Sequence, residues 1–484
     1  MRANGWPAGL RHSGTGRDDG PVSQATQLLT PSGRELLDRL RGIDVTPDQA
    51  LRFGTELRDR YPADLVAAAL TQQALRTAAR EKFSLADEMF FTRDGLEQAS
   101  GEQAARHSAR RFAGLALVAD LCCGIGGDLT ALARGAQQVL AVDADFDNLQ
   151  FATRNAAVYG ASGAVSPVCG DVRDLRLAGI PAAFIDPARR DGGHRLRPGD
   201  SRPPLSWCVA LADQVPRLCI KAAPGLAHTL VPAGWELEFV ALGRSLKEAL
   251  LWSPGFATTA RRATVLPVEP LAHSADAAGR TPDTGQGLDF RQQPVVGDVM
   301  EQTPDGRDSA YLTSDAGHSA GRTPDTGQGL DFRQQPDVGH TLEAGTGAVP
   351  RVPVSAPGEY LLDPNPAVTR AGLVAELAHE LGAWQLDPMI AFLSLDRPAS
   401  TPFARTLRVI ASLPWREREV ARKLRELGIG AADIRRRGLA GDVQQIHRRL
   451  GLKGDKSAVI VLTRRNDRPW GLICEPVRPN PASS

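Results

Sequence analysis

The sequence predicts an α/β fold built on a parallel, doubly wound sheet, with a helical unit before the sheet and a small α+β unit after it. Three observations predict this arrangement. Short apolar runs alternate with helical stretches over residues 115–267, apolar residues recur at helical spacing before them, and strand and helix patterns return after residue 357. A chain of 484 residues also exceeds what one hydrophobic core usually serves, so several domains are expected.

The first part of the chain divides into a leader and a helical domain. Residues 1–32 lack apolar periodicity and are rich in Gly, Arg and Ser, which predicts a disordered leader. Leu36 and Leu40 then stand at helical spacing, and the segment Asp64–Phe83 is rich in Ala and Leu. We therefore expect a helical N-terminal domain over residues 33–113.

The central segment, residues 114–268, carries the main strand signals. Seven short apolar runs occur there, and helical stretches separate the first three of them. Apolar strands that alternate with helices are typical of a parallel sheet covered on both faces, so we expect a seven-stranded Rossmann-like sheet. The expected strands are Leu115–Leu121, Gln138–Ala144, Val165–Cys169, Ala182–Asp186, Leu218–Ala222, Leu237–Leu242 and Arg262–Pro267.

Residues 269–357 interrupt this pattern. They hold 6 basic against 13 acidic residues, and the sequence AGRTPDTGQGLDFRQQP occurs twice in them, at Ala278–Pro294 and Ala320–Pro336. A repeat architecture is one interpretation, but neither copy has strand or helix periodicity and repeat folds normally need at least about three copies. We therefore expect a disordered acidic insertion that arose by local duplication.

The last segment, residues 358–484, returns to ordered patterns. A Pro-started helix and a strand precede signals in β-α-β-α-β order, which predicts a small α+β domain of ferredoxin-like type. Residues 397–468 hold 18 basic against 7 acidic residues, a bias typical of nucleic-acid binding. A solvated surface in an arginine-rich protein is the alternative. The candidate nucleic-acid contacts are Arg435, Arg436, Arg437, Arg448, Arg449 and Lys453.

Composition argues against several other classes of protein. No apolar run approaches the roughly 18 residues of a membrane span, and the first thirty residues show no apolar core of a secretory signal. The six cysteines form no C-x-x-C pair and have no His partner at metal-ligand spacing, so neither a disulfide framework nor a metal site is expected. A cytoplasmic enzyme is the expectation.

A glycine-rich turn, Asp120–Asp128, follows the first expected strand. Glycines at such a turn let the backbone approach a ligand and leave helix amides free to bind it. A dinucleotide site is one interpretation, but after Gly124 and Gly126 the third fingerprint position is Leu129. Asp120 faces the expected pocket, and its carboxylate suits a ligand with an ammonium group, such as the methionine part of S-adenosylmethionine.

Three more carboxylates stand at the ends of successive strands. Asp143 ends the second strand, 19 residues after Gly124, where a carboxylate can accept both ribose hydroxyls. Asp171 follows the third strand, facing an adenine amino group, and Asp186 ends the fourth, where substrate meets cofactor. Each alone could cap a loop or helix, but all four in order favour a cofactor site. The candidate cofactor-binding residues are Asp120, Cys122, Gly124, Gly126, Gly127, Asp128, Asp143, Asp171 and Asp186.

These motifs carry a resemblance to a known family. Residues 115–267 resemble class I S-adenosylmethionine-dependent methyltransferases, and DLCCGIGGD, AVDAD, NAAVYG and CGDV are similar to the trimethylguanosine synthase group of RNA cap guanine-N2 methyltransferases. MFFTRDGLEQA, FIDPARR and the basic last domain resemble bacterial methyltransferase-like proteins that end in a THUMP-like domain. The resemblance implies S-adenosyl-L-methionine as cofactor and structured RNA, tRNA or rRNA, as substrate.

The acceptor motif departs from that family. Enzymes that methylate exocyclic amines usually carry Asp, Asn or Ser, then two prolines and an aromatic residue, whereas here Ala188 and Arg189 follow Asp186-Pro187. Asp186 would orient the acceptor amine, and Arg189 would stack on a base, bind a phosphate or pair with an acid. Asp186, Pro187 and Arg189 are therefore the catalytic candidates. Two alternatives stay open: a protein or small-molecule acceptor, and a non-catalytic RNA-binding protein that keeps the fold.

Overall fold

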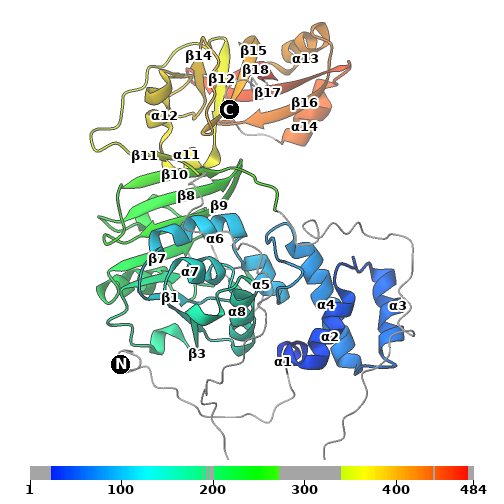
Figure 1. Cartoon of the computed structure of the whole chain (residues 1–484). Helices are drawn as coiled ribbons and strands as arrows, with labels where there is room; N and C mark the ends of the chain where they lie inside the picture. The colour runs from blue at the N-terminus through cyan, green and yellow to red at the C-terminus, as the bar shows by residue number, and fades with distance from the viewer. Residues whose placement is uncertain are drawn as a thin grey trace, which may run out of the picture.

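The computed structural model describes residues 23–188, 190–191, 194–195, 201–271, 339–439 and 442–477. Figure 1 shows a helical unit beside a large sheet with helices packed against it, and a second sheet beyond the first. In the described ranges, no helix is both long and apolar enough to cross a membrane. The predicted α/β class, with a helical unit before the sheet and an α+β unit after it, is confirmed.

The helices that precede the sheet begin at strong capping signals. Thr30 caps one helix, Thr46 forms a capping box with Gln49, and a proline stands in the first turn of both helices. The first helix lies inside the expected leader, where Ser23 caps it and Leu28 packs into the helical core. Its six residues are too few to show periodicity. The helices are α1 (Gln24–Leu29), α2 (Pro31–Leu40), α3 (Pro47–Leu57), α4 (Ala63–Ala79), α5 (Arg93–Gln98) and α6 (Glu102–Ala109).

All seven expected strands form in the central sheet, and two further strands join them. In the described part of the chain, the sheet order is β11-β10-β8-β9-β7-β4-β1-β2-β3. Neighbouring strands from β3 to β7 pair in parallel. The expected strands are β1 (Val118–Leu121), β2 (Val139–Asp143), β3 (Val165–Cys169), β4 (Ala182–Ile185), β7 (Arg217–Ala222), β8 (Glu236–Leu242) and β10 (Arg261–Leu266).

The two additional strands are β9 (Ser245–Trp252) and β11 (His340–Glu343). The β9 sequence SLKEALLW consists mostly of good helix formers, so local propensity gives no strand signal. It nevertheless pairs antiparallel with both β7 and β8, which satisfies its backbone on both edges. Strand β11 pairs antiparallel with β10, so this part of the expected disordered insertion is ordered. Both duplicated copies lie outside the described residues.

Alternate residues of the central strands face two different layers. Val118 and Val139 pack with residues of α6, α7 and α8, whereas Ala119 and Leu140 belong to a core shared with α9 and with two helices of the C-terminal unit. The sheet is therefore buried on both faces. The helices that complete these layers are α7 (Leu129–Gly135), α8 (Phe146–Val158) and α9 (Leu205–Ala210). Strands β5 (Arg190–Asp191) and β6 (His194–Arg195) pair antiparallel in a separate small sheet.

The C-terminal unit forms a second sheet with the order β13-β14-β12-β15-β18-β17-β16. Before the Pro-started helix, residues 360–364 form a strand between β14 and β15, and Asn365 caps the helix that follows. Its elements are β12 (Tyr360–Pro364), α11 (Pro366–Ala371), α12 (Val374–Leu381), β13 (Trp384–Gln385), β14 (Leu393–Leu395), β15 (Ala404–Pro414), α13 (Glu417–Glu426), β16 (Ile429–Arg436), α14 (Val443–Leu450), β17 (Lys456–Arg465) and β18 (Arg468–Pro476).

A buried carboxylate, Asp363, ties the two sheets together. Arg244, from the turn between β8 and β9, donates to Asp363 Oδ2 over 2.9 Å. Arg437, just after β16, donates to Asp363 Oδ1 over 3.0 Å, and Arg435 also donates to Asp363 Oδ2. The amide of Asn365 in addition donates to the carbonyl of Gly243 over 2.8 Å. The Arg244–Asp363 and Asn365–Gly243 contacts fix the C-terminal sheet relative to the central sheet, whereas Arg435 and Arg437 hold Asp363 from within the C-terminal unit.

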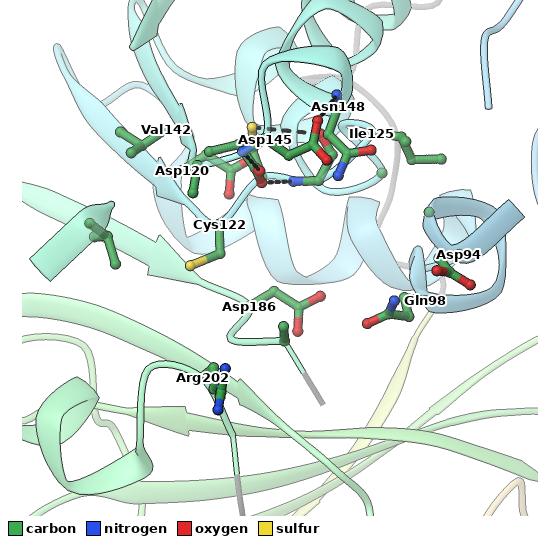
Figure 2. Close-up of a pocket in the computed structure, with 18 of the residues that line it drawn as sticks. Asp94, Gln98, Asp120, Cys122, Ile125, Val142, Asp145, Asn148, Asp186 and Arg202 are labelled. Atoms are coloured by element: carbon green, nitrogen blue, oxygen red, sulfur yellow. Dashed lines mark hydrogen bonds between the residues drawn. The ribbon is translucent and has the colours of Figure 1, made fainter. Parts of the chain in front are cut away.

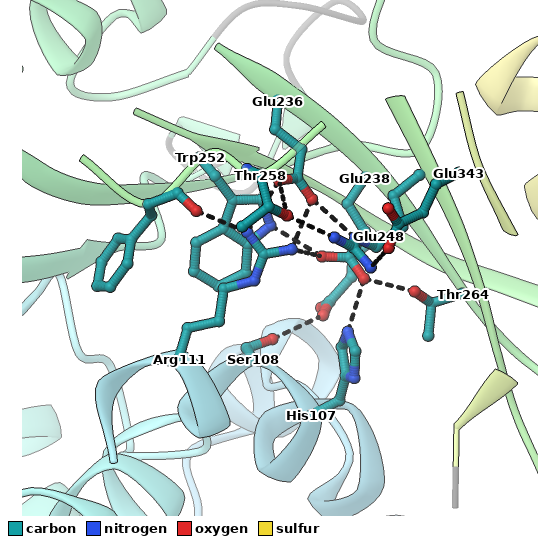
Figure 3. Close-up of polar contacts among 12 residues, drawn as sticks. His107, Ser108, Arg111, Glu236, Glu238, Glu248, Trp252, Thr258, Thr264 and Glu343 are labelled. Atoms are coloured by element: carbon teal, nitrogen blue, oxygen red, sulfur yellow. Dashed lines mark hydrogen bonds and ion pairs between the residues drawn. The ribbon is translucent and has the colours of Figure 1, made fainter. Parts of the chain in front are cut away.

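A second ionic network fastens α6 and the following 3₁₀ turn, η1 (Arg110–Phe112), to the sheet (Figure 3). His107 Nε2 lies 2.7 Å from Glu238 Oε1, and Arg111 donates to Glu236 over 2.5 Å. Arg262 of β10 donates to the same Glu236 over 2.8 Å. Burial by itself raises the pKa of Glu238, but His107 and Arg111 more than offset this effect, so that its pKa lies below the ordinary value.

Candidate active site

A cavity of about 900 Å³ opens at the carboxyl ends of β1, β2 and β4. Its walls come from the β1–α7 and β2–α8 loops, the segment after β3, the end of β4, helix α5 and residues 202–204. Figure 2 shows carboxylates and amides from these segments facing one space. Eight of the nine candidate cofactor residues line the cavity: Asp120, Cys122, Gly124, Gly127, Asp128, Asp143, Asp171 and Asp186.

Asp120, at the end of β1, is a buried carboxylate with an unused oxygen. Its side chain is 1% exposed, and Oδ2 has no hydrogen-bond partner among the described residues. Burial, with repulsion from Asp128 and Asp186, raises its pKa well above the usual range. A cationic group of a ligand would supply the missing partner and favour the ionised carboxylate.

The glycine-rich turn brings its backbone to the cavity wall. Cys122 has φ of 60° and Gly124 has φ of 54°, and the Gly124 amide donates to Asp143 Oδ2 over 2.8 Å. Gly126 instead has a packing role, because a Cβ added there would lie 2.9 Å from Cα of Ala152. Burial raises the pKa of the Cys122 thiol, so this side chain is not prepared to act as a nucleophile.

Asp143 lies against the glycine-rich turn at the end of β2, and Asp171 lines the cavity just after β3. Asp143 also accepts from the Asp145 amide over 2.9 Å, so each of its oxygens holds one backbone donor and can accept one more. Asp171 caps the turn after β3 and binds the guanidinium of Arg173, which lowers the pKa of Asp171 to about 2. The capping alternative therefore holds for Asp171, although it also lines the cavity.

The acceptor motif is only partly described by the structure. Asp186 lines the cavity, and its Oδ2 accepts from Lys221 Nζ over 2.6 Å (Figure 2 shows the carboxylate). Pro187 is buried and Arg189 lies outside the described residues. Ala188 pairs with Arg202, as each amide donates to the other's carbonyl over 2.9 Å. This pairing places Arg202 on the cavity wall beside Asp186.

Two parts of the site were not predicted from the sequence. Helix α5 and the residue before it supply the wall opposite Asp186, including Asp94 and Gln98 (Figure 2). The TRDG sequence of this segment does not indicate that it lines the cavity, because α5 is brought to the glycine-rich turn only by tertiary packing. Lys221, which contacts Asp186, could have been noticed in the sequence, because it is the single charged residue in the apolar run LCIKA. Within the described residues, no group of three or more His, Cys, Asp or Glu side chains could hold a metal.

The six candidate nucleic-acid contacts divide into two groups. Arg435 and Arg437 are half-buried and pair with Asp363, so they serve an ion-pair network inside the C-terminal unit rather than an open surface. The other four are exposed on and near α14: Arg436, Arg448, Arg449 and Lys453. One of these, Arg449, donates to Glu417 of α13 over 3.3 Å.

Comparison with known proteins agrees with this architecture. Residues 115–193 match a family model described as RNA cap guanine-N2 methyltransferase, residues 404–476 match one described as THUMP domain-like, and residues 21–79 match a domain of unknown function. A crystal structure from Porphyromonas gingivalis W83, assigned as a methyltransferase, superposes with a TM-score of 0.62 at 16% identity. The superposition covers 90% of this chain and 100% of that one.

Two relatives come from Mycobacterium tuberculosis, strains CDC 1551 and H37Rv, and both are described as uncharacterized S-adenosylmethionine-dependent methyltransferases. Each is 30% identical over 388 residues, which cover 77% of this chain and 84% of the relative. The cofactor implied by these relatives fits a cavity that holds a buried, unpartnered carboxylate oxygen and a glycine-rich backbone wall. The chain belongs to this family of S-adenosylmethionine-dependent methyltransferases.

Proposed function

We propose that this protein methylates an exocyclic amino group in structured RNA, either tRNA or rRNA, in the cytoplasm. One observation carries the proposal: the Asp186 carboxylate lines the same cavity as Asp120 and Asp143. A hydrogen-bond acceptor thus stands beside the cofactor site, where an amine must approach the methyl donor. The matches to RNA cap guanine-N2 methyltransferases and to THUMP domains support RNA as the acceptor.

The cavity residues divide between holding the cofactor and preparing the acceptor. Asp120 would pair with the ammonium group, and Asp143 would accept the ribose hydroxyls through the two oxygens that also hold backbone amides. When bound, the cofactor supplies an electrophilic methyl group on a sulfonium. Asp186 would accept a hydrogen bond from the amine, orient its lone pair and take its proton after transfer. Such chemistry depends mainly on positioning, which the strand ends and loops around the cavity provide.

Asp120→Asn should weaken cofactor binding and stabilise the free protein at the same time. We expect affinity for S-adenosylmethionine, measured by calorimetry, to fall about 10- to 100-fold, because the variant cannot form a buried charge-assisted hydrogen bond with the ammonium group. Since the pKa of Asp120 is raised, its ionised form destabilises the free fold above the ordinary pKa of 3.8. The substitution should therefore add about 1–3 kcal/mol to the unfolding free energy at neutral pH.

The control for this experiment is Asp174→Asn, which changes an exposed carboxylate outside the cavity and should alter neither quantity. The stability gain of Asp120→Asn should vanish when the pH falls below the ordinary carboxyl range, where Asp120 is protonated in both states. A variant that binds the cofactor with unchanged affinity would show that Asp120 does not face the ammonium group.

The exposed basic residues near α14 form the RNA surface in this proposal. Arg448 lies on the helix, Lys453 follows it, and Arg436 ends the neighbouring strand β16. At the end of β17, which pairs with β16, the guanidinium of Arg465 lies 5.2 Å from the ring centroid of Trp470, which is half-buried. Basic groups with an adjacent aromatic ring suit phosphates and unstacked bases.

Arg448→Glu combined with Lys453→Glu should weaken RNA binding in a salt-dependent way. In the full chain, we expect the slope of log affinity against log salt to become shallower by about 0.7–0.9 for each phosphate group that the variant no longer neutralises. Fluorescence anisotropy with a labelled tRNA pool measures this slope. Arg58→Glu, an exposed arginine on the helical unit, is the matched control. An unchanged slope in the double variant would show that Arg448 and Lys453 do not contact the RNA phosphates.

The deciding experiment for the whole proposal compares modified nucleosides in RNA from cells with and without the protein. Loss of one methylated nucleoside identifies both the RNA and the acceptor atom. In parallel, the purified protein and labelled cofactor are added to lysate from cells that lack the protein. Methyl label in RNA supports the proposal. Label only in protein or in a small molecule would show that RNA is not the methyl acceptor.

A further inference from the structure

Lys221 is a buried lysine in the middle of the central sheet. It lies on β7, its side chain is 2% exposed, and it does not line the cavity. Its Nζ donates to Asp128 Oδ2 over 3.0 Å and to Asp186 Oδ2 over 2.6 Å. A lysine at this depth destabilises the fold unless its charge is paired, and an apolar residue at the same position would avoid that desolvation penalty. The position therefore calls for a functional explanation.

The two partners of Lys221 come from opposite sides of the proposed reaction. Asp128 follows the glycine-rich turn and stands at the start of α7, yet its side chain makes no capping hydrogen bond with the helix. Asp186 ends the strand that leads to the acceptor motif. One ammonium group therefore joins the wall of the cofactor site to the carboxylate on the acceptor side. Capping does not explain why Asp128 is an acid.

Most charged groups near Lys221 are carboxylates; one further cation, Lys82, also lies in range, because burial and repulsion from Lys221 lower its pKa. Besides Asp128 and Asp186, the buried Asp120 and Glu248 face the same region, and Glu248 accepts from Ser100 and Ser108 over 3.2 Å and 3.3 Å. Without the ammonium group, like charges would repel and favour protonated carboxyls. Burial alone lowers the pKa of Lys221, but its carboxylate neighbours outweigh that effect and raise its pKa, so the ammonium form persists.

We propose that Lys221 is a positioning residue that holds the Asp186 carboxylate in place and oriented toward the acceptor amine. The inference rests on the proposed function, because it assigns Asp186 to the acceptor. During transfer, the N–CH₃ bond forms as the S–CH₃ bond breaks, and the amine proton then passes to Asp186. Lys221 stays protonated throughout and does not touch the substrate.

The first experiment compares Lys221→Met with Lys247→Met, which removes an exposed lysine from neighbouring β9. For Lys221→Met we expect kcat to fall about 10- to 100-fold with KM for S-adenosylmethionine changed less than about threefold, the pattern of a lost transition-state interaction. The acid limb of the kcat–pH profile should move to higher pH, because the cluster of buried carboxyls loses the cation that favours their ionised forms. Lys247→Met should leave the profile unchanged.

Lys221→Arg is the conservative variant and should restore the acid limb in part, because it keeps a cation between the two carboxylates. If Lys221→Met does not fold, Lys221→Arg replaces it as the test variant. A lysine with only a structural role would behave differently. In that case kcat, KM and thermal stability would worsen together and the acid limb would stay in place, which overturns the proposal.

The second experiment does not require an acceptor. The chain has six lysines, so selective ¹⁵N-lysine labelling gives a simple spectrum, in which Lys221→Met identifies the Lys221 signal. That signal should stay in its ammonium form at a pH where the exposed lysines titrate, and Asp186→Asn should shift it. If the Lys221 signal titrates together with those of the exposed lysines and does not shift in Asp186→Asn, the inference is wrong. If wild-type protein methylates no RNA but shows this signal, the proposed function fails and the ion pair stands.

Discussion

Asp186→Ala should lower kcat for methyl transfer to RNA about 10²- to 10⁴-fold, the usual range for loss of a positioned proton acceptor. The affinity for S-adenosylmethionine should change less than about threefold, because Asp120 and Asp143 would still hold the cofactor. Asp186→Asn should lie between wild type and Asp186→Ala. Its amide oxygen can accept a hydrogen bond from the amine but cannot take the proton. Single-turnover transfer of labelled methyl measures the effect.

The control for Asp186→Ala is Asp213→Ala, which removes an exposed carboxylate of the same domain at a distance from the cavity. It should match the wild type in both kcat and cofactor affinity. If Asp186→Ala kept the wild-type kcat, the proton acceptor would have to be another group. The cavity offers Asp94, on helix α5, as the next carboxylate to change.

Glu238→Ala should lower the free energy of unfolding by about 3–5 kcal/mol, the usual cost of removing one partner of a buried ion pair. Glu238 is fully buried, accepts from Trp252 Nε1 over 2.8 Å and pairs with His107 and Arg111. The substitution leaves these donors without their shared acceptor. Urea unfolding of both proteins at neutral pH measures the difference.

The pH dependence of this loss follows from the lowered pKa of Glu238. A carboxylate whose pKa is depressed by folding stabilises the protein above its ordinary value, here 4.5, and loses that effect as the pH falls toward the folded-state pKa. The difference between wild type and Glu238→Ala should therefore narrow below about pH 4.5. Glu343→Ala removes an exposed glutamate from the same network and should cost at most about 1 kcal/mol. Equal losses of unfolding free energy in Glu238→Ala and Glu343→Ala would contradict the central role of Glu238 in this network.

The strands and the glycine-rich turn could be predicted because their signals are local. The apolar run that contains Asp120 forms β1, and Gly124 and Gly126 after it adopt the positive φ values that the turn needs. The second strand likewise delivers Asp143 to within reach of the Gly124 amide. In a parallel sheet, strand ends meet at one edge, so residues at successive strand ends could be placed together from the sequence alone.

Other elements were not predictable, because their local sequence favours something else. The β9 segment has helix-forming residues, and only pairing with β7 and β8 makes it a strand. The short β11 has no periodicity of its own and depends on β10. In both cases backbone hydrogen bonds to distant strands outweigh intrinsic propensity.

The sequence by itself determined the class of the fold, the position of the cofactor turn and the order of the carboxylates at the strand ends. Only the tertiary structure decided what each charge does. Lys221 meets Asp128, 93 residues away, and Arg437 meets Asp363, 74 residues away, so neither pairing leaves a local pattern. Periodicity and turn chemistry are properties of neighbouring residues, whereas a buried ion pair exists only after folding excludes water from groups that the chain holds far apart.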